Sequence, residues 1–138
     1  MKEKAVITKE VAESEFNKWF EAKRLPDYLL EKNQDDKDAI IAAIQDGRLS
    51  LNENNEFIQK LLFPVQTGSN EISELKYRFR VPEGELAAST RGVKPDDLIG
   101  QLSICYISTL TGLQKGIIRS LDPADSLIGK KIAAFFFI

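Results

Sequence analysis

The sequence predicts an α+β fold in which helices near both ends of the chain flank a small antiparallel β-meander. Apolar residues recur at helical spacing in both end regions, and they alternate with polar residues between 71 and 81. The 138 residues, of which 43% are hydrophobic and 29% charged, are enough to bury a core without metals or disulfides. We therefore expect a single domain over residues 1–138, with a helical part (1–47), a β-meander (48–81) and C-terminal helices (94–138).

In the N-terminal part, residues 1–7 read as a short strand or a loose arm. A first helix is expected from Thr8, whose hydroxyl can cap it, to Pro26, which ends it. Its apolar stripe comprises Val11, Phe16, Trp19 and Phe20. One further turn is expected at 28–30, and another helix at 39–45, preceded by the acidic run 35–38 and stopped by Gly47.

After Gly47 the apolar period changes from that of a helix to that of strands. Residues 48–51 and 56–63 read as strands around a polar turn, and Pro64 and Gly68 mark a loop. A third strand is expected over 71–81, because apolar and basic side chains alternate there: Leu75, Tyr77, Phe79 and Val81 on one face, and Lys76, Arg78 and Arg80 on the other. Residues 84–94 have the composition of a flexible linker.

The C-terminal region carries the clearest helix signals. Pro95, followed by two aspartates, suits a first turn, and Gly112 suits a helix end. The apolar stripe between them comprises Ile99, Leu102, Tyr106, Leu110 and Leu113. A short helix at 114–120 follows. Asp122 can then cap a last helix, with Pro123 in its first position and Asp125 at the same positive end of the helix dipole.

The residue types argue against an enzyme, a cofactor or a metal site. There is no histidine, which removes the commonest general base and transition-metal ligand, and no phosphate-binding glycine motif occurs. Cys105 lies in an apolar helical pattern that is typical of a core cysteine. The cluster of Asp35, Asp36 and Asp38 lacks EF-hand spacing, so we favour a solvated helix start over a metal or acid–base site.

Nucleic acid and membrane are also poorly supported as partners. Lys76, Arg78 and Arg80 interleave with aromatic residues as in some single-strand binders, but strand alternation places cations and rings on opposite faces. The net charge of −2 provides no basic field, so a basic outer strand face is the favoured interpretation. The apolar run 132–138 is far shorter than the roughly 20 residues that span a bilayer, and the first ten residues lack a signal-like apolar run. We expect a cytoplasmic protein.

The C-terminal helix contains more large apolar residues than a short terminal helix needs in order to dock. Because chain termini usually fray into water, these residues must either pack on the domain or contact a partner. One interpretation is a partner or self-association surface formed by Leu127, Ile128, Ile132, Phe135, Phe136 and Phe137, which Ile138 extends. The alternative is that they all fold back onto the helix of 99–113 as core. Deletion of residues 134–138 separates the two.

The motifs that start and end the helices of this region are similar to those of a known family. The letters KPDD (94–97) open a helix, LTGL (110–113) close it, and LDPAD (121–125) start the last one, after a β segment ISELKYRFR (72–80). Over roughly residues 61–137 this pattern resembles the tail assembly chaperones of long-tailed bacteriophages. The resemblance implies a non-enzymatic protein that binds the helix-rich tape measure protein and the major tail protein in the infected cell. It also implies self-association and absence from the mature virion.

A different class of protein remains open beside the chaperone. The chain would then be a small structural or adaptor subunit of a phage-like particle, or an unrelated bacterial adaptor. In that case the C-terminal aromatic residues would close a permanent oligomer interface, and exchange kinetics would distinguish it from a transient one.

Overall fold

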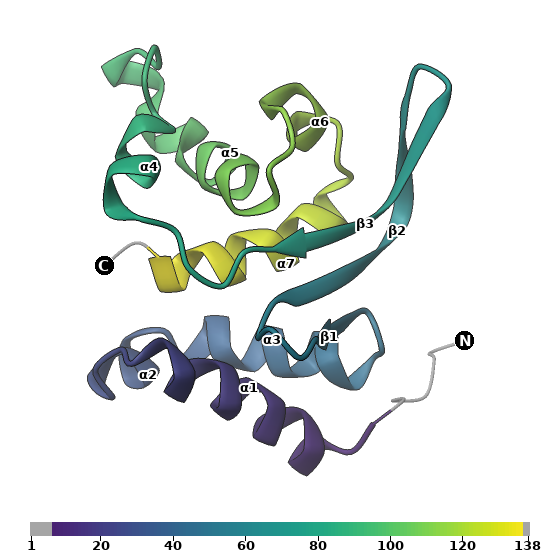
Figure 1. Ribbon diagram of the computed structural model, residues 1–138, viewed down its shortest axis with the longest axis vertical. Helices are drawn as coiled ribbons and strands as arrows, with labels where there is room; N and C mark the ends of the chain where they lie inside the picture. Colours follow the sequence, from purple (N-terminus) through teal and green to yellow (C-terminus); the bar gives the residue numbers. More distant parts are fainter. Residues whose placement is uncertain (1–6, 137–138) are drawn as a thin grey trace.

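The computed structural model describes residues 7–136 and confirms the α+β class (Figure 1). Three antiparallel strands, paired in the order β1-β2-β3, lie between N-terminal and C-terminal helices. The elements in chain order are α1 (Lys9–Lys23), α2 (Tyr28–Lys32), α3 (Gln34–Gln45), β1 (Leu49–Leu51), β2 (Phe57–Thr67), β3 (Asn70–Tyr77), α4 (Glu83–Ala88), the 3₁₀ turn η1 (Pro95–Asp97), α5 (Leu98–Thr111), α6 (Lys115–Arg119), α7 (Pro123–Ala133) and the 3₁₀ turn η2 (Ala134–Phe136).

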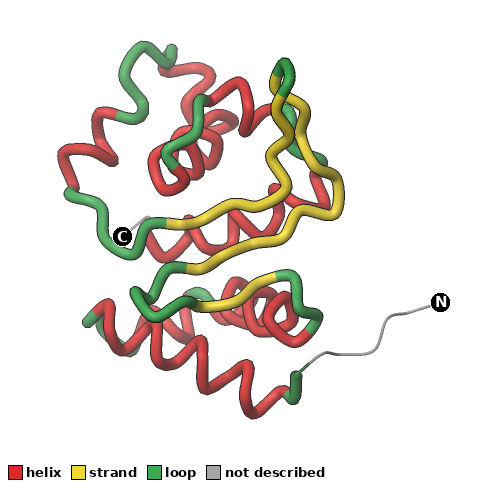
Figure 2. Tube along the Cα trace, turned by 45° about the vertical axis from the view of Figure 1, so that its right-hand side comes forward, coloured by secondary structure: helices red, strands yellow, loops and turns green. Residues whose placement is uncertain are grey.

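Helix α7 lies at the centre of this arrangement. Helices α1–α3 lie on one side of it and α4–α6 on the other, and α7 packs against α3, α5 and β2 (Figure 1). The β2–β3 hairpin runs beside α7 (Figure 2), and its turn stands apart from α6 in the view of Figure 1. The last helix of the chain therefore holds the two helical groups and the sheet together.

The N-terminal helices follow the sequence signals, with differences at their edges. The Thr8 hydroxyl accepts a hydrogen bond from the Val11 amide (3.3 Å), so the predicted cap is confirmed. Val11 itself is largely exposed, and Ala12 takes its place in the core. Helix α3 begins five residues before the predicted position 39, because the acidic run forms its first turn. Carboxylates are stabilised at that end of a helix, which is why this run extends the helix.

Two strand boundaries differ from the prediction. Strand β2 continues through Pro64, where a loop was expected, and it contains an irregularity between Lys60 and Val65. Strand β3 ends at Tyr77 rather than at residue 81. The next amide, that of Arg78, donates to the carbonyl of Leu110 in α5 (2.8 Å) and so leaves the ladder.

The stretch 84–94, predicted as a flexible linker, contains a helix. Residues Glu83–Ala88 form α4, which begins after Pro82. Leu86 is buried and attaches this short helix to the core. The prediction was wrong because a single buried leucine is too weak a periodic signal beside the glycine and alanine residues around it.

Helix α5 has the predicted start and end, but only part of the predicted buried stripe. Pro95 opens η1, and Gly112 ends α5 with a positive φ of 73°. The buried residues, Cys105, Ile107 and Leu110, all lie in the second half of the helix. Ile99, predicted to be buried, is 92% exposed. The apolar pattern therefore predicted the helix correctly, but it wrongly predicted that the first turn of the helix is buried.

Candidate functional site

The structure buries most of the residues predicted to form a C-terminal partner surface. Ile128, Ile132, Phe135 and Phe136 are core residues, so the prediction of a surface is wrong for these four. Leu127 is exposed (51%). Phe137, like Ile138, lies outside the described residues. The alternative interpretation, that this segment packs on the domain, is the one that holds for the four buried side chains.

The aromatic end of the segment packs mainly on α1, rather than on α5 as the alternative supposed. The ring of Phe135 makes edge-on contacts with Phe16 (centroids 5.6 Å apart), Trp19 (5.7 Å) and Phe20 (6.0 Å). Fully burying one phenylalanine side chain contributes about 1.5–3 kcal/mol, and aromatic pairs add to this. The apolar C-terminal residues are therefore used to join the two ends of the chain.

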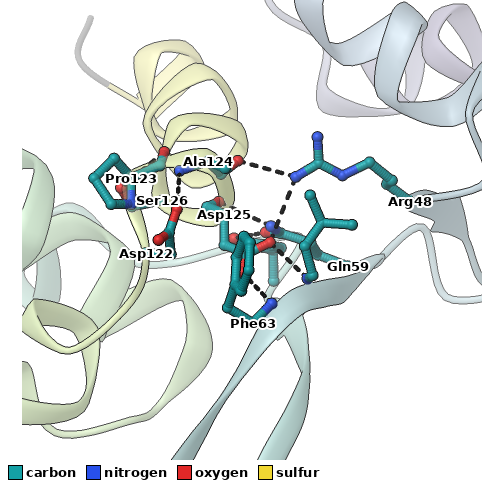
Figure 3. A network of polar contacts seen from close by, with 10 residues as sticks. Arg48, Gln59, Phe63, Asp122, Pro123, Ala124, Asp125 and Ser126 are labelled. Atoms are coloured by element: carbon teal, nitrogen blue, oxygen red, sulfur yellow. Dashed lines mark hydrogen bonds and ion pairs between the residues drawn. The ribbon is translucent and has the colours of Figure 1, made fainter. Parts of the chain in front are cut away.

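At the other end of α7, Asp125 is fully buried and organises a polar network (Figure 3). Its carboxylate accepts hydrogen bonds from the backbone amides of Leu62 (2.8 Å) and Phe63 (3.0 Å) in β2. Arg48 Nη2 lies 3.4 Å from the same carboxylate and donates to the Ala124 carbonyl (2.9 Å). The sequence assigned Asp125 only to the helix dipole. Asp122, by contrast, caps α7 as predicted, because its carboxylate accepts from the Ala124 amide (2.9 Å).

The network continues into the core through Gln59. Its side-chain amide donates to the Asp125 carbonyl (2.8 Å), and its oxygen accepts from the Tyr77 hydroxyl (2.5 Å). Burial, and secondly the charge of Asp125, raises the pKa of Tyr77 well above its usual range, so the phenol stays neutral. Asp125, Gln59 and Tyr77 are all closed off from solvent. We therefore assign this network to positioning β2 against α7 rather than to chemistry.

The network positions a bulge in β2, between Lys60 and Val65. Lys60 pairs with Glu74 and Val65 with Ile72, so residues 61–64 of β2 face only Ser73 of β3. The amides of Leu62 and Phe63 find their acceptor in Asp125 instead of in β3. The side chains of Leu62 (52%) and Phe63 (56%), which are neighbours in the sequence, are both left exposed. We call Leu62, Phe63 and the exposed Pro64 the bulge surface.

The bulge surface is the strongest candidate for a partner contact among the exposed apolar residues. Single exposed apolar residues are normal, and Val11, Tyr28 and Leu127 are of this kind. Leu98 and Ile99, which are neighbours in the first turn of α5, are exposed as well. Bulges are conserved design features that often lie beside functional sites, and here a fully buried carboxylate holds one in place.

The basic stripe predicted on the third strand does not form one open cationic face. Lys76 is exposed, but Arg78 forms an ion pair with Glu85 of α4. Arg80 Nη2 donates to the carbonyl of Ala22 at the end of α1 (2.9 Å). Two of the three cations thus connect β3 and its extension to neighbouring helices.

Neither a metal centre nor a membrane span is found in the part of the chain that the structure describes. Residues 7–136 contain no cluster of three metal-binding side chains, and none of their helices is long and apolar enough to cross a bilayer. In the acidic run of α3, Asp36 lies 3.3 Å from Lys131 Nζ of α7. No protein-family model, curated protein or solved structure matches the chain.

Proposed function

We propose that this chain is a tail assembly chaperone of a long-tailed bacteriophage. It is a non-enzymatic protein that binds the tape measure protein and the major tail protein in the cytoplasm of the infected bacterium and is absent from the mature virion. Two things support this: the resemblance of residues 61–137 to that family, and an exposed apolar contact surface on a mainly helical domain.

The observation that carries the proposal is the bulge surface. Fully burying a leucine or phenylalanine side chain is worth about 1.5–3 kcal/mol, and Leu62 and Phe63 are each about half exposed. Covering both would therefore contribute roughly 1.5–3 kcal/mol to binding. Such a contribution suits contacts that form and break repeatedly as a tail tube polymerises.

A helical partner fits this surface. Amphipathic helices bind through apolar residues spaced three or four positions apart, which form a stripe that can lie across two adjacent apolar side chains. The tape measure protein, as the resemblance describes it, is long and rich in such helices. We propose that its apolar stripes contact Leu62 and Phe63 until tail tube subunits replace the chaperone.

Co-expression with the tape measure protein encoded in the same gene cluster tests this proposal. We expect the wild-type chain to keep the tape measure protein soluble and to co-purify with it, and the double substitution Leu62→Ser, Phe63→Ser to lose both effects. The matched control is Leu98→Ser, Ile99→Ser, which removes the other exposed apolar pair. Equal solubilisation by the wild type and the bulge variant would contradict the proposal, provided that both are folded by circular dichroism.

The long β2–β3 hairpin, whose turn stands apart from α6, favours one second candidate, a small structural or adaptor subunit with a permanent interface (Figure 1). Arms of this shape can pair with neighbouring subunits through exposed strand edges. Mixing two fluorescently labelled populations distinguishes the candidates. A chaperone that self-associates weakly exchanges subunits within minutes, whereas a permanent oligomer keeps its labels separate for hours.

A further inference from the structure

At the opposite end of α7 from the bulge surface, a pocket of about 490 Å³ opens between the end of α1 and the segment that joins β3 to α4. Its walls are mainly apolar, with contributions from Leu25, Val81, Leu86 and Phe136. Pockets that bind small ligands have this character: an apolar lining of roughly 300–1,000 Å³ with a few fixed polar groups. The charged side chains that line this one are Lys23, Arg80 and Glu83.

Lys23 is an unusual lysine because its side chain is buried. Its ammonium donates to the Phe79 carbonyl and lies over the rings of Phe136 (3.9 Å to the centroid), Phe79 (4.8 Å) and Trp19 (5.3 Å). An ammonium group has three donors, and within residues 7–136 the Phe79 carbonyl is the one hydrogen-bond acceptor that Lys23 contacts. Burial, and secondly the nearby Arg80 guanidinium, lowers the pKa of Lys23 to about 8.

Neither Lys23 nor Arg80 forms an ion pair with any carboxylate in residues 7–136. Glu83, the acidic residue of the pocket wall, is paired with neither of them, and its charge is the second cause, after burial, of the raised pKa of Tyr106 in α5. Arg80 donates to a carbonyl, which leaves its positive charge uncompensated. Two like charges thus line one mainly apolar pocket, and among the described residues neither is paired with a carboxylate, an arrangement that an anion would stabilise.

We infer that this pocket binds a carboxylate carried on an apolar stem, with the carboxylate between Lys23 and Arg80 and the stem against Leu86 and Phe136. Carboxylates pair well with guanidinium and ammonium donors, and the partly apolar surroundings strengthen the attraction. Free fatty acids and the carboxyl terminus of an apolar peptide share this chemistry. The inference is independent of the proposed chaperone function, because it uses neither the bulge surface nor a tail protein.

The test is a titration of the ¹⁵N-labelled full chain followed by amide chemical shifts at pH 7. The probes are octanoate and its uncharged counterpart octanol, and the tripeptide acetyl-Leu-Leu-Phe with a free or an amidated carboxyl group. We expect saturable shifts at Leu25, Val81 and Leu86, with at least tenfold tighter binding of a carboxylate probe than of its uncharged counterpart. Whichever carboxylate binds more tightly identifies the source as a small molecule or a peptide.

Variants of Arg80 separate a built site from general apolar binding. Arg80→Gln should weaken carboxylate binding at least tenfold, and Arg80→Lys should restore most of it, because the positive charge rather than the fork geometry is the main requirement. Carboxylate affinity should also fall between pH 7 and pH 9.5, since Lys23 loses its proton in this range while the probe remains ionised. Absence of shifts at the pocket, equal binding of octanoate and octanol, or binding that Arg80→Gln leaves unchanged would each overturn the inference.

Discussion

Replacing Asp125 by asparagine should cost far more stability than an isosteric change usually does. The substitution keeps the volume but replaces one carboxylate oxygen with an NH₂ group. Only one of the amides of Leu62 and Phe63 then keeps its acceptor, and the other faces a second donor. Leaving one buried donor unsatisfied costs about 1–3 kcal/mol. Arg48 also loses its ion-pair partner, at a reduced cost because its side chain is 25% exposed.

These terms add to about 3 kcal/mol out of a typical total of 5–15 kcal/mol, which corresponds to a fall in Tm of roughly 10–15 °C for a domain of this size. Urea unfolding and calorimetry measure the effect. Hydrogen exchange should show that the amides of Leu62 and Phe63 lose protection first. The matched control is Asp122→Asn three residues earlier, which should change stability by less than about 0.5 kcal/mol because asparagine caps helices as well as aspartate. If both variants are equally stable, the network does not hold the bulge.

Further predictions concern other parts of the molecule. Gly129→Ala should destabilise the protein by about 1–2 kcal/mol, because the new Cβ would lie 2.9 Å from Tyr77 Oη. Gly100→Ala should stabilise it by about 0.5–1 kcal/mol, because a Cβ at that position has no neighbour within 4 Å and alanine favours the helix. Thermal melts compare the two variants. Deletion of residues 134–138 should lower the Tm by more than 10 °C or prevent folding, since it removes two buried phenylalanines; a folded, unchanged truncation would contradict their place in the core. Between pH 8 and pH 10.5 the stability of the wild type should rise relative to that of Lys23→Met by roughly 1 kcal/mol or more. The reason is that Lys23 is neutral in the folded protein in this range but regains its usual pKa on unfolding, so that unfolding takes up a proton. A stability difference that is constant with pH would refute this.

Local signals predicted the elements well because each depends on neighbouring residues. The Thr8 cap, the helix end at Gly112 and the Asp122–Pro123 start need only short-range chemistry, and all three are found. Whether a given face of a helix or strand is buried depends on residues far away in the sequence, so burial was harder to predict than the elements themselves. Periodicity placed Ile99 in a stripe, for example, but could not show that the first turn of α5 extends beyond its packing partners.

The candidate site was missed for the same reason. Leu62 and Phe63 read as consecutive strand residues, and Pro64 predicts the start of a loop rather than part of a bulge within a longer strand. The signal lies in Asp125, 63 residues after Leu62, where it resembles any acidic residue in a first helical turn. A second aspartate three residues after the cap, in a helix rich in apolar residues, was one available hint that one of the two is buried.

The long separation between the bulge and Asp125 has a consequence for how the protein is made. During translation the β2 segment emerges well before α7, and until then the amides of Leu62 and Phe63 have no internal acceptor. Contacts between distant segments form late in folding, because the intervening chain must close first. The bulge surface therefore takes its final shape only after residues as far as α7 have been synthesised and have docked. A ribosome-bound fragment that ends before Asp125 would lack it, so the ability to bind a partner arises together with completion of the fold.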